Sequence, residues 1–259
     1  MDRADLDHFS QNLFIIIGAQ RCGSTYLYKL LDDHPEVQMN HPVSPEPKFF
    51  IEEDQYASGS GFYYATYFSG GSSVGDQGAR RYGEKSTSYL EYGWVADRIA
   101  TMFPHAKVIV ILRNPAERAL SNYYFTKQHG LEDRTARAAI LAPDPTVEAA
   151  VATSVSPYAY FKRGLYQTYL APYMQRFGSN MHIVLFENLI TSNEEFRQVS
   201  NFLGVSPTSK SVDAIVNQSV RPVRRSRAEQ SLVTELTELY ASSVEELELL
   251  TGKDLSVWK

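Results

Sequence analysis

Apolar and polar positions along the chain predict strands and helices in alternation. Residues 14–17 and 107–112 form almost uninterrupted apolar runs, and residues 182–186 form a third. A short, continuous apolar run is typical of a strand that is covered on both faces in a parallel sheet. Shorter strands are predicted at residues 37–39 and at a segment that ends near residues 82–85.

The segments between these strands have the spacing of amphipathic helices. The best marked begins at Asn114, a preferred N-cap residue, and has Pro115 at its first position. Strands that alternate with helices predict an α/β fold, in which helices lie on both faces of a parallel sheet. The first predicted helix ends at residue 31. The others span residues 59–68, 94–103, 114–128, 166–177, 194–203 and 228–250.

Some segments lack this periodicity. Three prolines in residues 42–51 predict an extended path that no helix can follow. Residues 70–78 predict a surface loop, residues 217–227 are basic and irregular, and residues 130–156 predict an insertion on the substrate side. A length of 259 residues suits one large α/β domain, so we predict a single domain over residues 1–259.

Composition excludes several classes of protein. Hydrophobic residues make up 43% of the chain and charged residues 21%, which is ordinary for a soluble globular protein. The formal charge of −5 argues against broad binding of nucleic acid. The single cysteine, Cys22, permits no intramolecular disulfide and no zinc constellation. No apolar run approaches the ~20 residues that span a bilayer, so we expect a cytoplasmic protein without a transmembrane segment.

The first predicted strand runs into a loop with the features of a phosphate site. Gly18 and Gly23 allow sharp turns, and the amides of Arg21 to Thr25 precede the positive end of a helix. The two glycines have P-loop spacing, but Ser24 stands where nucleotide hydrolases have lysine. Without that lysine the loop suits a smaller phosphate-like group, with Arg21 as its cation.

A second anion site is predicted at the end of the strand over residues 107–112. In open parallel sheets, ligands bind beyond the carboxyl ends of the strands. Arg113 directly follows this strand, and Ser121 lies two turns into the next helix. The Arg113 guanidinium and the Ser121 hydroxyl can together bind a second phosphate.

Two of these segments carry a family resemblance. Gly18-Ala-Gln-Arg-Cys-Gly-Ser-Thr25 resembles the 5′-phosphosulfate loop of sulfotransferases that use 3′-phosphoadenosine 5′-phosphosulfate (PAPS), nearest to the carbohydrate and heparan-sulfate type. Leu112-Arg-Asn-Pro-Ala-Glu-Arg-Ala-Leu-Ser-Asn-Tyr123 resembles their 3′-phosphate motif. Glu46-Pro-Lys-Phe-Phe50, Gly83-Glu-Lys-Ser86 and the arginines of residues 221–227 resemble further motifs, in the family's order.

The resemblance implies a P-loop-type three-layer sandwich with a parallel sheet of about five strands. It implies PAPS as donor, adenosine 3′,5′-bisphosphate as product and no metal. The resemblance also implies which residues contact the donor. The 3′-phosphate is bound by Arg113 and Ser121, and Arg224 and Arg225 contact the cofactor from a late capping loop. The 5′-phosphosulfate is bound by Arg21, Cys22, Gly23, Ser24 and Thr25.

Sulfuryl transfer needs a base for the acceptor and cations for the leaving oxygen. Glu46, on the proline-stiffened segment, is the predicted general base, because desolvation can raise the proton affinity of an enclosed carboxylate. Arg21 and Lys85 are predicted to stabilise the developing charge. Many relatives have lysine at the position of Arg21; arginine stays protonated, so Arg21 acts as a fixed charge. Many also have histidine at the position of Lys48, where this chain has a cation that suits an anionic acceptor.

Two other functions remain open from the sequence. A P-loop kinase of a small molecule would need another cation in place of the absent lysine and would depend on Mg²⁺ and ATP. A catalytically silent module would bind a nucleotide without transferring a group. Under the sulfotransferase hypothesis the acceptor is a hydroxyl or amine of a carbohydrate, a lipid or a natural product, and the oligomeric state is left open.

Overall fold

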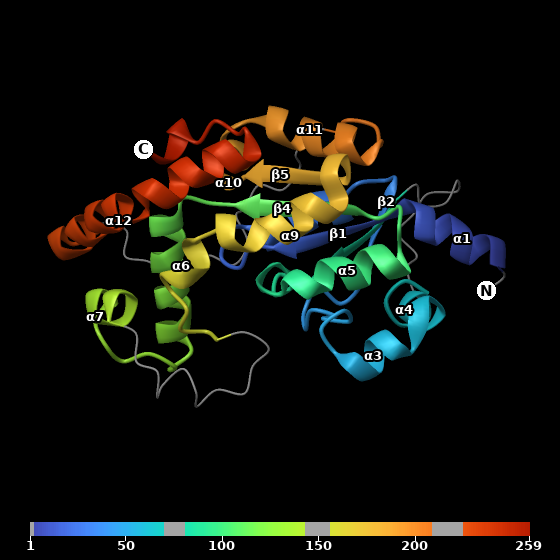
Figure 1. The fold of residues 1–259 in the computed structure, drawn as a ribbon, viewed down its shortest axis with the longest axis horizontal. Coiled ribbons are helices and arrows are strands. Elements are labelled where there is room, and N and C mark those ends of the chain that lie inside the picture. Colours follow the sequence, from blue (N-terminus) through green and yellow to red (C-terminus); the bar gives the residue numbers. More distant parts are fainter. Residues whose placement is uncertain (1–2, 70–80, 143–155, 209–224) are drawn as a thin grey trace. The chain divides into compact units, whose positions relative to one another are not determined.

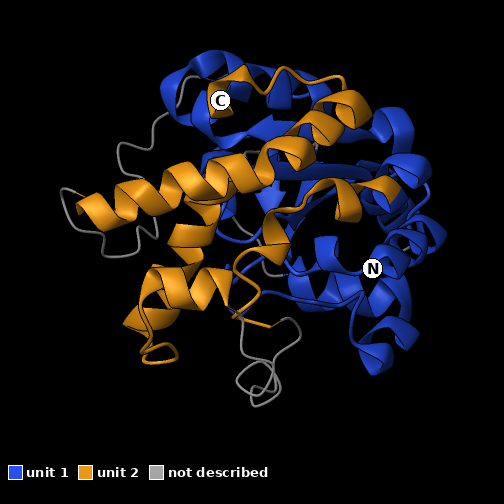
Figure 2. Ribbon diagram, turned by 60° about the vertical axis from the view of Figure 1, so that its left-hand side comes forward, with its two compact units in different colours: residues 1–112, 172–216 blue, residues 113–171, 217–259 orange. Residues whose placement is uncertain are grey.

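The chain folds into two compact units, which Figure 2 shows in different colours. The computed structural model describes residues 3–69, 81–142, 156–208 and 225–259. The first unit comprises residues 1–112 and 172–216, and the second comprises residues 113–171 and 217–259. The prediction of one functional domain over residues 1–259 stays a prediction.

A five-stranded sheet forms the centre of the first unit. All of its strand pairs are parallel, and the strand order is β2-β3-β1-β4-β5. Figure 1 shows the arrowheads of β1, β4 and β5 pointing the same way, so their carboxyl ends share one edge. The sheet confirms the predicted α/β fold with about five parallel strands. Its strands are β1 (Leu13–Gly18), β2 (Val37–Met39), β3 (Arg81–Lys85), β4 (Lys107–Leu112) and β5 (Met181–Leu185).

Helices flank this sheet and bury its central strands. Every residue of β1 is buried, and β4 is buried after its first residue. Helix α1 contacts β3, α2 contacts β2, and α10 and α11 contact β5. The helices of this unit are α1 (Arg3–Asn12), α2 (Ser24–Asp32), α3 (Glu53–Ala57), α4 (Gly59–Tyr67), α5 (Gly93–Met102), α10 (Phe186–Thr191) and α11 (Asn193–Leu203), with 3₁₀ turns η1 (Tyr89–Glu91) and η3 (Gly178–Asn180).

The second unit is helical in its described part. Helix α6 contacts α7, η2 and α12. The Ser226 side chain and Glu229 form a capping box that begins α12, and the rings of Phe161 and Tyr240 stack at 4.4 Å. Its elements are α6 (Pro115–Gln128), α7 (Ala136–Leu141), η2 (Lys162–Gly164), α12 (Arg227–Thr251) and η4 (Ser256–Trp258), while α9 (Gln167–Phe177) passes from this unit to the first.

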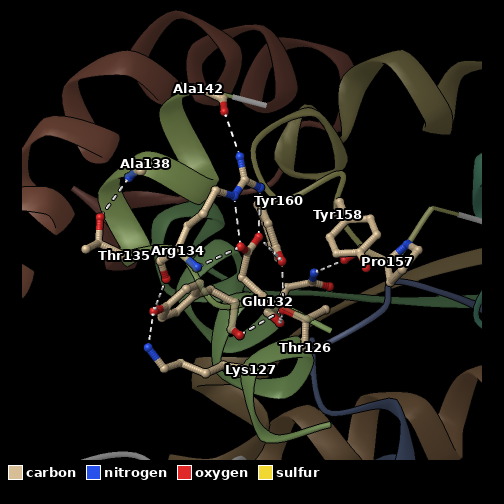
Figure 3. Close-up of polar contacts among 12 residues, drawn as sticks. Thr126, Lys127, Glu132, Arg134, Thr135, Ala138, Ala142, Pro157, Tyr158 and Tyr160 are labelled. Carbon is tan, nitrogen blue, oxygen red and sulfur yellow. Dashed lines mark hydrogen bonds and ion pairs between the residues drawn. The ribbon is translucent and has the colours of Figure 1, made fainter. Parts of the chain in front are cut away.

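Buried polar contacts fix both ends of the predicted insertion over residues 130–156 (Figure 3). The Arg134 guanidinium donates two 2.8 Å hydrogen bonds to the Glu132 carboxylate. Tyr160 donates to the same carboxylate at 3.1 Å and contacts the Thr126 hydroxyl at 2.7 Å. The hydrogen bonds from Arg134 hold the pKa of Glu132 below its ordinary value. These contacts hold the start of the insertion and the chain that follows it against α6.

Most predicted elements are present, and the differences have local causes. Helix α1 was not predicted, because its first half is charged; only Phe9 on it is buried. Strand β5 ends one residue before the predicted boundary, since Phe186 begins α10. The predicted loop at residues 70–78 and residues 143–155 of the insertion lie outside the described residues. Among the described helices, none has the length and apolar character that a membrane span requires.

Candidate active site

The loop between β1 and α2 has the backbone features that the predicted anion site requires. Gly23 and Arg21 both have positive φ, at 90° and 66°, which turns the chain from the strand into the helix. In the described structure no side chain caps the N-terminus of α2, so its first amides remain available to a ligand. Ser24 is buried in this turn and Thr25 is half-buried. Arg21 to Gly23 therefore form the turn, and Ser24 and Thr25 begin α2.

Gly23 is the tightest point of this loop. A Cβ atom at Gly23 would lie 2.4 Å from Cδ2 of Phe186, the first residue of α10. Residues with side chains rarely adopt a φ of +90°. The loop therefore needs glycine at this position both for its backbone conformation and for the close approach of Phe186.

We predict that Gly23→Ala destabilises the protein by about 2 kcal/mol through strain at positive φ and overpacking. The urea midpoint of unfolding should fall, and the affinity for adenosine 3′,5′-bisphosphate should fall with it because the loop must shift. Gly61→Ala is the matched control, since a Cβ at this helical glycine meets nothing within 4 Å. Gly61→Ala should leave stability unchanged or raise it; equal losses in both variants would contradict the special role of Gly23.

Glu46 and Lys85 are far apart in sequence but form a hydrogen-bonded ion pair in the first unit. The Lys85 ammonium donates to Glu46 Oε1 at 2.5 Å, and both side chains are largely buried. Thr87 donates its amide to Glu46 Oε2 at 2.9 Å, and its hydroxyl lies 3.0 Å from each carboxylate oxygen. A carboxylate only accepts hydrogen bonds, so these donors match an ionised Glu46 and fix its orientation.

The sheet brings this pair to the edge where the phosphate loop begins. Lys85 is the last residue of β3 and pairs with Ile16 of β1, two residues before the loop. The Lys85 amide donates to Asn40 Oδ1 at 3.1 Å, and the Asn40 amide donates to the carbonyl of Gly83 at 2.8 Å. Asn40 thus ties the start of the proline-rich segment to β3, which places Glu46 beside Lys85.

Lys48 lies on the same segment and is anchored through its backbone. Its amide donates to the Ser86 hydroxyl at 2.9 Å, and its φ is +54°. Its carbonyl accepts from the amides of Ile51 and Glu52 at 2.9 and 3.2 Å. The segment has no helix or strand, as its prolines predicted, but the chain after Lys48 forms a tight turn where an extended path was predicted. The role of Lys48 toward an acceptor stays a prediction.

The predicted 3′-phosphate residues belong to the second unit. The Asn114 side chain accepts from the amides of Ala116 and Glu117, at 3.0 and 3.2 Å, which confirms the predicted N-cap. Arg113 directly precedes the N-cap of α6, and Glu117 and Ser121 stand four residues apart on the helix, on one face. Ser121 is buried, and Arg113 is half-buried.

Glu117 joins two of the predicted phosphate-binding arginines. Its carboxylate accepts two hydrogen bonds from Arg225, at 2.6 and 2.7 Å, and lies 3.8 Å from the Arg113 guanidinium. The carboxylate thus opposes part of the positive charge that a phosphate would meet. Arg224, the other predicted late contact, lies outside the described residues.

Thr87, Asn40 and Glu117 were missed by reasoning from the sequence. Thr87 stands immediately after the Gly83-Glu-Lys-Ser86 motif, and Glu117 lies inside the 3′-phosphate motif. Their positions beside recognised motifs could have identified both as candidate site residues. Asn40 had no such position, because its role comes from strand pairing. Among the described residues, no three His, Cys, Asp or Glu side chains cluster as metal ligands.

Comparisons with known proteins all point to one family. The family model for the sulfotransferase domain matches residues 11–248. The chain is 30% identical over 202 residues to the human bifunctional heparan sulfate N-deacetylase/N-sulfotransferase 1, covering 75% of this chain and 22% of that protein. It is 35% identical over 115 residues to the membrane-associated sulfotransferase kil1 of Dictyostelium discoideum, covering 44% and 23%. The chain thus spans about a fifth of the length of these relatives.

A solved structure shares the fold over nearly the whole chain. The crystal structure of a sulfotransferase from Alicyclobacillus acidocaldarius superposes with a TM-score of 0.71 at 26% identity. The match covers 95% of this chain and 97% of that chain. The similarity therefore includes both the parallel sheet and the helical part that follows β4 in sequence.

Proposed function

Because the chain belongs to the sulfotransferase domain family, we propose that it transfers the sulfuryl group of PAPS to a hydroxyl or amine of a carbohydrate. The loop from Gly18 to Thr25 resembles a phosphate-binding loop but lacks the lysine of nucleotide hydrolases, which favours PAPS over ATP as the donor. The uncapped N-terminus of α2 suits the 5′-phosphosulfate. A metal-independent reaction in the cytoplasm is part of the same proposal.

The donor contacts follow from these sites. Arg21 to Thr25 bind the 5′-phosphosulfate through backbone amides, hydroxyls and the Arg21 charge. Arg113 and Ser121 bind the 3′-phosphate, and Arg225 adds a second cation there. Because Arg225 donates two hydrogen bonds to the Glu117 carboxylate, the phosphate must compete with this carboxylate for the arginine.

The contact between Lys85 and Glu46 carries the proposed chemistry. Glu46 accepts the proton of the acceptor hydroxyl or amine as the new bond to sulfur forms. The bond between sulfur and the bridging oxygen breaks, and adenosine 3′,5′-bisphosphate leaves with the electron pair. Lys85 and Arg21 stabilise the negative charge on that oxygen. Since Lys85 touches Glu46 at 2.5 Å, one site holds both a base and a cation.

A carbohydrate acceptor is proposed over a lipid or a natural product because of the relatives. The named relatives include heparan sulfate N-sulfotransferases. Lys48 extends this proposal, because its cation suits an acceptor that already carries carboxylate or sulfate groups. Whether oxygen or nitrogen is sulfated follows from which acceptor is used.

Calorimetry and a transfer assay test the proposed function together. Adenosine 3′,5′-bisphosphate should bind strongly without Mg²⁺ and much more tightly than ATP, and PAPS labelled in its sulfate should label a polysaccharide with free hydroxyl or amino groups. Mg²⁺-dependent binding that favours ATP would support the kinase hypothesis. Bisphosphate binding without transfer to any acceptor would support a silent nucleotide-binding module.

Arg113→Ala should weaken binding of adenosine 3′,5′-bisphosphate by about 1.5–3 kcal/mol, or roughly 10- to 150-fold, because a charge-assisted contact to phosphate is lost. Calorimetry at fixed salt measures the change. Arg137→Ala is the control, since Arg137 is exposed and pairs with Glu235 in the same unit. If Arg113→Ala binds the bisphosphate as the wild type does, Arg113 is not a phosphate ligand.

A further inference from the structure

Thr87 contacts the proposed base Glu46 through both its backbone and its side chain. The Thr87 amide donates to Glu46 Oε2 at 2.9 Å. The Thr87 hydroxyl lies 3.0 Å from Oε1 and 3.0 Å from Oε2, whereas the Lys85 ammonium donates to Oε1. Thr87 is buried in the first unit. Its hydroxyl is therefore within hydrogen-bonding distance of whichever carboxylate oxygen takes up a proton.

The turn that carries Thr87 is fixed at the end of β1, where the phosphate loop begins. Thr87 follows Ser86, whose amide donates to the carbonyl of Ile16 in β1 at 3.1 Å. A Cβ atom at Gly18, the last residue of β1, would lie 3.3 Å from the Thr87 carbonyl oxygen. Glycine at this position therefore allows the turn to approach the loop closely. Through Thr87, Glu46 is held to the strand from which the predicted phosphosulfate loop starts.

Of the described partners of Glu46, only the Thr87 hydroxyl can both donate and accept a hydrogen bond. The Lys85 ammonium and the Thr87 amide are donors only. An ionised carboxylate only accepts, whereas a protonated one also has a proton to donate. The hydroxyl has one proton and two lone pairs, so it can donate to ionised Glu46 and accept from protonated Glu46. It therefore fits Glu46 both before and after proton transfer.

We infer that Thr87 is a positioning residue, whose hydroxyl orients the Glu46 carboxylate and turns from donor to acceptor as Glu46 takes up the proton. The inference rests on the proposed function, because it extends the role of Glu46. The proton passes from the acceptor hydroxyl or amine to Glu46 while the new bond to sulfur forms, and Thr87 keeps its own proton throughout. Because the Thr87 amide is part of the backbone, side-chain variants keep its hydrogen bond and test the hydroxyl alone.

The first test compares Thr87→Val with Thr87→Ser in the full chain, using PAPS labelled in its sulfate and a polysaccharide acceptor. Thr87→Val keeps the branched shape and removes the hydroxyl, so it should lower kcat by roughly 10-fold because the base is less well oriented. Thr87→Ser keeps the hydroxyl and should retain most of the wild-type kcat. The KM for the acceptor and the affinity for adenosine 3′,5′-bisphosphate should change in neither variant, because Thr87 acts only through Glu46.

The same variants separate positioning from packing, which matters because Thr87 is buried. Thr87→Ser removes a methyl group and leaves a small cavity, whereas Thr87→Val leaves none. A packing role therefore predicts the larger loss of kcat in Thr87→Ser, and positioning predicts it in Thr87→Val. Thr87→Ser and Thr87→Ala both lack the methyl group and differ only in the hydroxyl. Their kcat values decide the question even if Thr87→Val does not fold.

Ser88→Ala is the control for the loss of a hydroxyl in this turn. Ser88 follows Thr87 and is fully buried, and its hydroxyl has no hydrogen-bond partner among the residues that the structure describes. Ser88→Ala should therefore keep the wild-type kcat. If it lowered kcat as far as Thr87→Val does, the effect would come from the turn as a whole, and the specific role of Thr87 would be overturned.

A double variant tests whether Thr87 acts through Glu46. In the Glu46→Gln background no carboxylate remains to be oriented for proton uptake, so adding Thr87→Val should lower the residual kcat little further. A further loss as large as that in the wild-type background would show that Thr87 acts on another group, and it would overturn the inference.

The outcomes separate this inference from the proposed function. If Thr87→Val keeps the wild-type kcat while Glu46→Gln is strongly impaired, the inference is overturned and the proposed function stands. If the wild type prefers ATP to the bisphosphate and labels no acceptor, the proposed function fails and the inference fails with it. A loss of kcat in Thr87→Val that is absent in Thr87→Ser and disappears in the Glu46→Gln background supports the positioning role.

Discussion

Replacing Glu46 by glutamine should lower kcat for sulfate transfer by about 10²- to 10⁴-fold, the range for loss of a general base. Glutamine keeps the shape of the side chain, and its carbonyl oxygen can still accept from one of the two donors, the Lys85 ammonium or the Thr87 amide, which bond different oxygens of Glu46. It cannot accept the proton of the acceptor. Binding of adenosine 3′,5′-bisphosphate should therefore be unchanged, and calorimetry beside the labelled-sulfate assay separates binding from chemistry.

Glu52→Gln is the matched control for Glu46→Gln. Glu52 is an exposed carboxylate at the N-cap of α3, at the end of the same segment. Its replacement makes the same change of charge close to Glu46 in sequence, so kcat should stay near the wild-type value. A wild-type kcat in Glu46→Gln would move the role of base to another group, and an equal loss in both variants would point to charge alone.

Replacing Lys85 by methionine should lower kcat by about 10²- to 10³-fold, because the cation that stabilises the leaving oxygen is lost. The change also leaves Glu46, which is largely buried, without its ammonium partner. Removing one member of such a pair leaves a charge poorly compensated, so we expect the free energy of unfolding to fall by about 1–3 kcal/mol. Single-turnover rates and urea unfolding measure the two effects separately.

Lys107→Met is the control for Lys85→Met, because it removes a strand lysine that lies away from the proposed site. Lys107 is the first residue of β4, so it lies at the edge of the sheet opposite the phosphate loop, and its ammonium donates to the carbonyl of Phe202. Lys107→Met should lower stability while kcat changes little. If it lowered kcat as far as Lys85→Met does, the effect would come from the sheet and not from the site.

Local sequence features were sufficient for the elements of the fold. The apolar runs at residues 14–17 and 107–112 are buried strands, and Asn114 with Pro115 begins α6 as predicted. These features depend on residues close together in sequence, because burial on both faces and N-capping each leave a pattern within one element. The missed α1 shows the limit, since one buried residue, Phe9, leaves no periodic pattern.

The sequence also supplied the chemical identity of the candidate groups. The resemblance of residues 18–25 and 112–123 to two motifs of the sulfotransferase family predicted an enzyme of that family, and the family model matches residues 11–248. Such motifs are local because backbone amides and neighbouring side chains bind an anion within one turn.

Only the tertiary structure decided which groups meet. It bonded Glu46 to Lys85 and Thr87, tied Asn40 to β3, and set Glu117 between Arg113 and Arg225. It also placed the Ser86 and Tyr89 hydroxyls where they accept the amides of Lys48 and Phe50 and so hold the Glu46 segment. Strand register and burial depend on residues far apart in the chain, and no pattern within one segment records them. The sequence therefore determined the fold class and the candidate groups, while parallel strand pairing decided which of these groups are in contact.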